Sequence, residues 1–586
     1  SSGGTLIRLR DVASVRREYV PHPSSLMFYN GTPAMDIGIS CVEGGNVILL
    51  GEEVEKHLRS FASRTPLGME LHPIYFQPGT VQTSIDVFVE NLAEAVAIVV
   101  ALLLVFMGLR SGLLIGAILV LTILATFVVM KAFAIDLHSI SLGAMVIALG
   151  MLVDSAIVVA DGILIAAQMG KTREDAAKSI VGQTQWPLLG ATVIAIVAFA
   201  PVGLSPDSTG EYCKSLFQVV GISLLLSWVL AVTITPLAGA VFLRTPPLPE
   251  GQNPFGSPSY QRYRQLLEFC LTHRPITLIA LGGMLALAAI GFTHVAPGFF
   301  PNDTSPMFTV DFWRPRGSSL AQTRQDAERM EAFLLSQEEA PSVASYVGEG
   351  AMRFLLTFTP ADPGNHYGSF VVRTKTGEEG TSLMKKITEF AAQEMPGLDP
   401  RVRSFGKGTG SGAKIQVRVQ GEDPDALRKT AERISAILLS DSRAINVRSD
   451  WGERTKVLRP VLDEVRARTS GLTRRDVAQA LEMAFSGTTT GIYRDGDKLL
   501  PIVARLPRED RSDAGTLPTV SVWSAALRTY LPLSQVVRAF DTVAEDQSIY
   551  RRNRVRTITV ECDAGDGKTA ALFDTLRPQV EARSEE

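Results

Sequence analysis

Residues 143–168 read GAMVIALGMLVDSAIVVADGILIAAQ, and this stretch decides the fold. It is apolar over a length that crosses a bilayer, and no charged residue occurs between Ile140 and Val153. Asp154 follows 16 residues after His138, so at a rise of about 1.5 Å per residue it lies roughly 24 Å into a hydrocarbon core of about 30 Å. A carboxylate there costs on the order of 3 kcal/mol or more. The stretch indicates either a proton or ion carrier, or a neutral Asp that hydrogen-bonds a neighbouring helix.

The composition fits a membrane protein with large soluble parts. Of the 586 residues, 46% are hydrophobic and 20% are charged, and the mean hydropathy is +0.17. The net charge of −3 gives no indication of nucleic-acid binding. The cysteines have no metal or disulfide spacing, and no HExxH motif or nucleophile–base pair points to an enzyme, a metal site or a cofactor. The first residues contain no apolar signal region, so we expect a chain that begins without its own export signal.

Six stretches are predicted to be transmembrane helices, since each is close to or above the roughly 20 residues needed to span. They are 87–109, 112–133, 138–165, 187–206, 215–243 and 276–297. The loops on one side are rich in Lys and Arg, namely Arg110, Lys171, Arg173, Lys178, Arg244, Arg262, Arg264 and Arg274. The other short loops hold only Lys131 and Lys214. The positive-inside rule makes the first side cytoplasmic, so residues 1–86 and those after 298 are expected outside, in the periplasm of a Gram-negative cell.

The predicted cytoplasmic link contains SYQRYRQLLEFCLTHR, residues 259–274. Tyr260, Tyr263, Leu267 and Cys270 recur at helical spacing. This pattern is typical of an amphipathic helix on the membrane surface, and equally of a soluble helix packed on the bundle.

The soluble parts repeat a strand–helix–strand pattern. It occurs at 307–350, at 368–406 and at 414–450. Near the start we expect strands at 34–42 and 69–76 around a helix at 47–63. Such units predict ferredoxin-like α+β modules.

A longer-range repeat relates IRLRDVASV, which begins at Ile7, to LPLSQVVRAF, which begins at Leu531. In the first copy the following strand leads through a helix to the membrane block. In the second copy the chain stops at Glu586, inside the expected helix. The repeat therefore predicts that this sequence is part of a longer protein built from two similar halves.

The chain resembles the resistance–nodulation–division (RND) family of efflux pumps, specifically its hydrophobe/amphiphile exporters, over nearly its whole length. The resemblance rests on RLRDVASV, NGTPAMDIGIS, FMGLRSGLLIGAILVLTILATF, GMLVDSAIVVAD, STGEYCKSLFQVVGISLLLSWVLAVTITPLAG, FFPNDTSPMFTVDF and GLTRRDVAQALEMAFSGTTTGIYRDGDKLLPIVARLP. It implies a homotrimer in the bacterial inner membrane, with twelve membrane helices, a porter domain and a docking domain in each subunit. Protons flow inward and drugs outward, with a periplasmic adaptor protein and an outer-membrane channel as partners.

The resemblance also implies a domain plan. Residues 1–86 would end the N-terminal porter half, 87–243 would supply five membrane helices, 244–275 the cytoplasmic link and 276–297 a sixth helix. One porter module would span 300–408. A second, incomplete one would combine 413–450 with 541–586, and a docking module would occupy 451–540.

On this resemblance Asp154 corresponds to the family's first intramembrane aspartate, the proton carrier. Members with an aspartate pair carry a second carboxylate at the next position, where this chain has Ser155. The family's partner cations lie on helices beyond Glu586. Gly143, Gly150, Asp154 and Asp161 share one helical stripe, where the glycines would admit a neighbouring helix and Asp161 would be an interfacial anchor.

The segment GAMRFLLTFTPADPGNHYGSFVV, 350–372, takes the place of the family's flexible substrate loop. Phe354, Phe358 and Tyr367 would line a path for hydrophobic compounds, unless they are core residues. The glycine-rich segment 405–414 lacks GK[ST], so we reject nucleotide binding. Two alternatives stay open. One is a heavy-metal exporter of the same family, with Met307 and Met352 facing the cleft, and the other is a truncated fragment that transports nothing.

Overall fold

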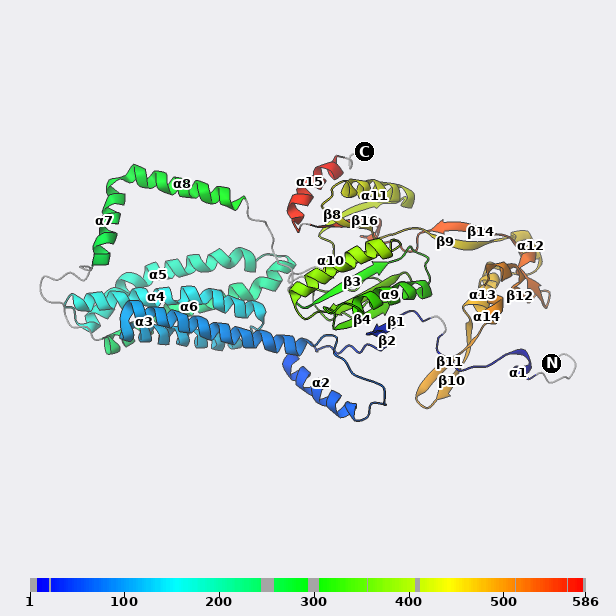
Figure 1. The fold of residues 1–586 in the computed structure, drawn as a ribbon, viewed down its shortest axis with the longest axis horizontal. Coiled ribbons are helices and arrows are strands. Elements are labelled where there is room, and N and C mark those ends of the chain that lie inside the picture. Colours follow the sequence, from blue (N-terminus) through cyan, green and yellow to red (C-terminus); the bar gives the residue numbers. More distant parts are fainter. Residues whose placement is uncertain are drawn as a thin grey trace.

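The computed structural model describes residues 8–20, 23–243, 258–293, 305–355, 357–405, 412–511, 513–565 and 567–582. Figure 1 shows a helical bundle at one end, two modules of sheet and helix in the middle, and a smaller module at the far end. The first residues of α3 lie at the end of the bundle that faces the sheet modules. Parts of the predicted cytoplasmic link (244–257) and of the glycine-rich segment (406–411) lie outside the described residues, as do 294–304 and 583–586.

The bundle is built from long helices, and five of the described helices are long and apolar enough to cross a membrane. The helices of this part are α3 (Gln77–Ala132), α4 (Ser139–Gln168), α5 (Arg173–Gly203), α6 (Ser208–Phe242), α7 (Pro258–Thr272) and α8 (Arg274–Phe292). All but α7 belong to the five. The predicted spans correspond to these helices, with the first two merged in α3.

Helix α3 is interrupted at Gly108, whose φ of +80° is not helical. The chain folds back there, because Gly116 in the second half lies against Val100 in the first. A Cβ at Gly116 would lie 2.8 Å from Val100 Cγ2. Glycine tolerates the positive φ that such a reversal needs. The two halves of α3 therefore pack on one another as a helical hairpin.

Helix α4 packs closely against α6 and also contacts α3 and α5. Its packed side is lined with small and aliphatic residues such as Ala148, Leu152 and Ala156. Ser227 Oγ of α6 donates a hydrogen bond of 2.6 Å to the carbonyl of Leu152. Small residues let the backbones approach, and the hydroxyl fixes their register.

Helices α7 and α8 depart from the bundle. Helix α8 has no buried residue, and it runs apart from α3–α6 in Figure 1. The described side chains of α7 are exposed except Cys270, which is half-buried. Of the two interpretations for 259–274, packing on the bundle is therefore not observed in the described part of the chain.

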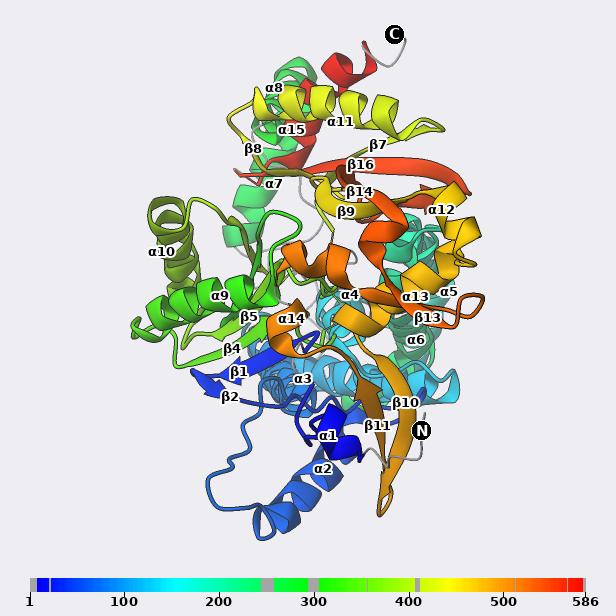
Figure 2. The ribbon, with the colours of Figure 1, turned by 90° about the vertical axis from the view of Figure 1, so that its right-hand side faces the viewer.

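The next module, called here the six-stranded module, has an antiparallel sheet of order β2-β1-β4-β5-β3-β6. Its elements are β1 (Leu26–Tyr29), β2 (Thr32–Pro33), β3 (Met307–Trp313), α9 (Leu320–Leu335), β4 (Ser342–Val347), β5 (Tyr367–Arg373), α10 (Gly377–Glu394) and β6 (Asp399–Ser404). Helices α9 and α10 cover one face of the sheet, as Figure 2 shows. Phe308, Val310 and Phe312 of β3 point to that face and join the core under the helices.

The four-stranded module follows. Its strand β16 pairs with β15, β7 and β8, and α11 and α15 pack beside it. Its elements are β7 (Ile415–Gly421), α11 (Pro424–Leu439), β8 (Ala444–Ser449), β15 (Arg551–Arg552), β16 (Val555–Ala564) and α15 (Thr569–Glu581). A separate apolar core, which includes the fully buried Trp451, holds this module together.

The distal module, residues 455–545, is inserted between β8 and β15. Its elements are β9 (Thr455–Leu462), α12 (Glu464–Thr469), α13 (Arg474–Phe485), β10 (Thr488–Asp495), β11 (Lys498–Ala504), α14 (Arg508–Arg511), the 3₁₀ turns Ala514–Thr519 and Leu533–Gln535, β12 (Ser521–Ser524), β13 (Thr529–Pro532) and β14 (Val537–Glu545). Strands β10 and β11 form a projecting hairpin (Figure 1). The module has its own core around Leu533 and Val536.

The N-terminal segment corrects two strand predictions. It contains α1 (Leu9–Val12) and α2 (Val47–Ala62), and α2 confirms the helix expected at 47–63. Residues 34–42 and 69–76 form no strand. The strand β1 lies earlier and ends in a tight turn at Asn30 and Gly31, both with positive φ. A strand needs a continuous ladder of hydrogen bonds with a neighbour. Segment 34–42 keeps only the bond from Ala34 N–H to the Met27 carbonyl of β1, and the described residues form no ladder with 69–76.

Candidate functional site

Asp154 lies on the side of α4 that faces away from α6. Its side chain is exposed, as is the neighbouring Gly150, whereas Ser155 is only 9% exposed and lies on the packed side. A Cβ built at Gly143 or Gly150 would meet nothing within 4 Å. Asp161, at the far end of the stripe, is half-buried. The predicted stripe therefore exists as one open face of α4, and no described helix approaches its glycines.

No described residue forms an ion pair or hydrogen bond with the Asp154 carboxylate. A carboxylate on an apolar helix is costly as a charge unless it finds a partner or a proton. The arrangement can hold a proton at Asp154 and release it when a cation or water approaches the open face.

The three predicted aromatic residues of the substrate path all lie in the six-stranded module. Phe354 packs on Phe358 and Phe405, with ring centroids 5.0 and 5.6 Å apart, and Tyr75 lies 5.3 Å from Phe354. Phe358 is 3% exposed, whereas Phe354 is half-buried. Together they form an aromatic cluster on the face of the sheet opposite α9 and α10. Of the three predicted residues Phe354, Phe358 and Tyr367, only Phe354 is partly exposed.

Tyr367 is fully buried and belongs to a polar site that the sequence did not predict. Its hydroxyl donates a hydrogen bond of 2.7 Å to Asp311 Oδ1, and Ser369 Oγ donates one of 2.8 Å to the same atom. Arg403 forms an ion pair of 2.8 Å with Asp311 Oδ2. Burial, with the nearby charge of Asp311, raises the pKa of Tyr367 far above its usual value, so this hydroxyl stays a donor. The only sequence signal was an aspartate inside an otherwise apolar strand.

A second polar site joins the edge strand β6 of the six-stranded module to β16 of the four-stranded module. The Arg401 side chain, 6% exposed, pairs with Asp563 at 3.0 Å and Glu561 at 3.5 Å. Arg448 pairs with Glu561 at 2.8 Å and lies 4.2 Å over the ring of Trp313. Burial and the charges of neighbouring arginines lower the pKa of Arg401. The two modules therefore meet through charged groups, and each retains its own apolar core.

Side chains that could bind a metal ion do not gather in the described part of the chain. Within the described ranges, no three His, Cys, Asp or Glu side chains form such a group. Met307 is buried in the aromatic cluster, and Met352 is exposed beside it.

Comparison with known proteins places these features in a family. The multidrug resistance protein MdtF of Escherichia coli (strain K12) is 24% identical over 570 residues, covering 90% of this chain and 53% of MdtF. The nickel and cobalt resistance protein CnrA of Cupriavidus metallidurans is 25% identical over 563 residues, covering 92% and 52%. The cobalt-zinc-cadmium resistance protein CzcA of the same organism is 23% identical over 590 residues, covering 96% and 54%. The chain thus spans about half the length of the curated relatives it matches.

A profile of the AcrB/AcrD/AcrF family matches residues 1–583. The match covers the bundle, both sheet modules and the distal module, and the relatives are RND pumps. The chain therefore belongs to the AcrB/AcrD/AcrF family of resistance–nodulation–division efflux transporters.

Proposed function

We propose that the full-length protein exports amphiphilic drugs or other hydrophobic compounds from the inner membrane and is driven by protons that Asp154 carries. The observation that supports this most directly is the exposed Asp154 side chain on the open face of α4, with which no described residue forms an ion pair or hydrogen bond. An ionisable group at membrane depth is a functional-site hypothesis by default. Gly150 would let a facing helix approach, and Asp161 would anchor the helix end. Members of this family are transporters, in keeping with the expectation that the protein is not an enzyme.

The proposed architecture follows the family. The two halves of α3 with α4, α5, α6 and α8 would give six spans, and the sheet modules would be ferredoxin-like porter modules in the periplasm. The distal module would be the docking module. A homotrimer would work with a periplasmic adaptor protein and an outer-membrane channel. The strand–helix–strand order of β3–α9–β4 and β5–α10–β6 supports the module assignment.

The proposal of an amphiphilic substrate rests on the aromatic cluster. Phe354 offers an accessible aromatic surface beside Phe358, whereas Tyr367 is buried and would act only through the shape of the site. Aromatic rings supply large apolar contact areas in pockets for hydrophobic ligands. Ser155, where an aspartate pair would have a second carboxylate, leaves α4 with one carboxylate at this depth.

A metal cation is the second candidate substrate. The names of the relatives CnrA and CzcA describe resistance to nickel, cobalt, zinc and cadmium. Met352, next in sequence to Ala351 of the aromatic cluster, is an exposed residue whose thioether is a ligand type suited to a soft cation.

An efflux screen of the complete gene separates the two candidates. A pump-deficient bacterial host would be tested with dyes, antibiotics, copper, silver, nickel and zinc, with and without an uncoupler. We expect tolerance to dyes that the uncoupler removes. Tolerance to metals alone would favour the metal exporter, and efflux that persists in the uncoupler would contradict proton coupling.

A further inference from the structure

The distal module is joined to the rest of the chain by two short connectors. Residues 450–454 run from β8 to β9, and residues 546–550 run from β14 to β15. Thr455 pairs with Glu545 where the β9–β14 ladder begins, so the two connectors lie side by side. The connectors are thus one route by which a displacement passes between the distal module and the sheets. The ion pairs of Arg17 with Asp495 and of Glu18 with Arg505 are another, through the N-terminal segment.

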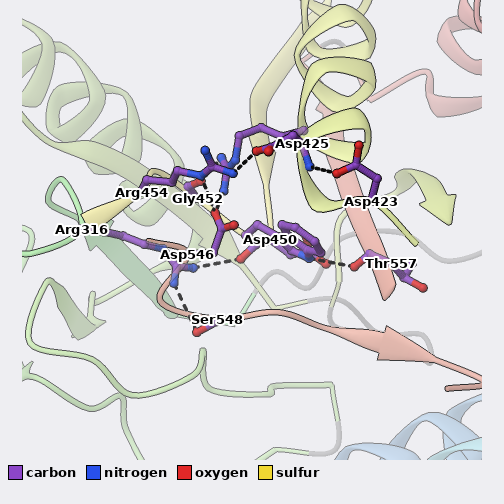
Figure 3. Close-up of polar contacts among 11 residues, drawn as sticks. Arg316, Asp423, Asp425, Asp450, Gly452, Arg454, Asp546, Ser548 and Thr557 are labelled. Atoms are coloured by element: carbon purple, nitrogen blue, oxygen red, sulfur yellow. Dashed lines mark hydrogen bonds and ion pairs between the residues drawn. The ribbon is translucent and has the colours of Figure 1, made fainter. Parts of the chain in front are cut away.

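The connectors are bound to the four-stranded module by a network around Asp546. This residue lies on the second connector, and its side chain is 8% exposed. Arg428 of α11 forms an ion pair with Asp546 and donates a hydrogen bond of 2.7 Å to the carbonyl of Gly452. Arg454 lies 3.4 Å from Asp546 and also pairs with Asp425 at the start of α11. Figure 3 shows this network. A buried carboxylate between two arginines holds the connectors in one geometry.

The six-stranded module reaches the same place with one side chain. Arg316, in the loop between β3 and α9, donates a hydrogen bond of 2.9 Å to the carbonyl of Asp450 on the first connector. Its other terminal nitrogen lies 3.4 Å from Ser548 Oγ on the second. The planar guanidinium thus contacts both connectors at once, as Figure 3 shows, which a lysine ammonium reproduces poorly.

Two glycines make this close approach possible. Gly452 has a φ of +59°, and a Cβ at this position would overlap Arg316 Nε. A Cβ at Gly317 would lie 2.9 Å from Thr455 Cγ2. The loop of the six-stranded module and the first connector therefore fit together only without side chains at these positions.

A second contact supports the same arrangement. The Tyr550 hydroxyl, on the second connector, donates a hydrogen bond of 2.6 Å to Asp362 of the six-stranded module. Burial, with the hydrogen bond to Asp362, raises the pKa of Tyr550 to about 12. The hydroxyl is therefore a donor throughout the neutral range.

We propose that Arg316 mechanically couples the six-stranded module to the distal module by binding both connectors. The modules have separate apolar cores, and polar interfaces between domains permit relative motion. With Arg316 in place, a displacement of the six-stranded module moves the connectors and hence the distal module. Without it, the six-stranded module no longer contacts both connectors at once, so the distal module follows its displacement less closely.

The test measures distances and does not depend on transport. Cysteine-free full-length protein would carry spin labels at the exposed positions Gln325 on α9 and Gln479 on α13, diluted so that distances arise within one protomer. We expect Arg316→Lys and Gly452→Ala each to broaden the distance distribution at least twofold. The double variant should be no broader than either single variant, because both changes remove the same contact.

Gly567→Ala is the matched control, since Gly567 has a φ of +72° and nothing within 4 Å of a built Cβ. This substitution introduces the same backbone strain without touching the connectors. The distance distribution should therefore be as narrow as in the parent protein. If Arg316→Lys and Gly452→Ala both kept the distance distribution of the parent protein, the proposed coupling would be wrong. Equal broadening in Gly567→Ala would also overturn it, since backbone strain alone would then explain the effect.

Discussion

Two carboxylates in different regions of the molecule show opposite solutions to the same physical problem. Asp311, in the six-stranded module, is 1% exposed and accepts hydrogen bonds from Tyr367 and Ser369 beside its ion pair with Arg403. Asp154, on α4 of the bundle, has an open face and no ion-pair or hydrogen-bond partner among the described residues. The first is fixed in position by its donors and its ion pair, whereas no described side chain forms a hydrogen bond or an ion pair with the second.

If Asp154 carries protons as we propose, the difference separates a structural carboxylate from a functional one. Buried polar groups with all their hydrogen bonds made stabilise one arrangement, and removing a partner is expensive. An unpartnered ionisable group on an apolar helix is tolerated where its change of state is used. Substitutions at both positions and around them test this contrast, from complete loss of function to almost no effect.

The largest effect is expected for Asp154→Asn in the full-length protein. Asparagine keeps the size and polarity but cannot carry a proton, so proton-coupled dye efflux should fall to the level of cells without the pump. Expression and thermal unfolding should change little, because no described residue forms a hydrogen bond or an ion pair with the side chain. Asp161→Asn is the matched control on the same stripe, and it should retain most of the efflux. Dye efflux that survives in Asp154→Asn would remove Asp154 from the mechanism.

Asp311→Ala should instead destabilise the six-stranded module. It leaves Arg403 and the Tyr367 hydroxyl without their shared partner, and breaking a buried ion pair in this way costs about 3–5 kcal/mol. Hydrogen exchange of the β3 amides measures the change. Thr309→Ala, on the same face of β3 and 2% exposed, is the control and should cost about 1 kcal/mol. If Asp311→Ala exchanged no faster than Thr309→Ala, Asp311 would not be the structural carboxylate that its contacts indicate.

Within the aromatic cluster the buried and half-buried rings should behave differently. Phe358→Ala removes a ring that is 3% exposed and should cost about 3 kcal/mol of stability. Phe354→Ala should cost less and should change which dyes are exported, since this ring has an accessible surface. Melting curves and a dye panel, run on both variants, distinguish the roles. An unchanged dye spectrum in Phe354→Ala would assign the whole cluster to the core.

The parts of this molecule that the sequence predicts are those set by local properties. Apolar length locates the long helices of the bundle, five of which, among the described helices, are long and apolar enough to cross a membrane. The predicted strands at 34–42 and 69–76 were wrong because a strand depends on a neighbour, which local alternation does not reveal. The role of Asp311 was missed for the same reason. Arg403, which completes its site, is 92 residues away.

The open face of α4 shows, within one helix, that local sequence does not reveal which residues pack against other elements. The spacing of Gly150 and Asp154 places them on one side of the helix, and both are exposed in the structure. The side on which Ser155 lies depends on where α6 packs, and local spacing does not determine that. Adjacent helical residues point about 100° apart, so neighbours in sequence face different surroundings.

Ser155→Ala should therefore have the smallest effect of all. Ser155 is 9% exposed and lies on the packed side of α4, away from the open face that presents Asp154. Alanine removes one hydroxyl without opening a large cavity, so stability should change by about 1 kcal/mol or less. If protons pass along the open face, efflux should stay within about twofold of the parent, the change expected from an energy difference below about 0.5 kcal/mol. A loss of tenfold or more, with unchanged expression, would instead make Ser155 part of the proton path. The packed side of α4 would then share the function that we assign to its open face.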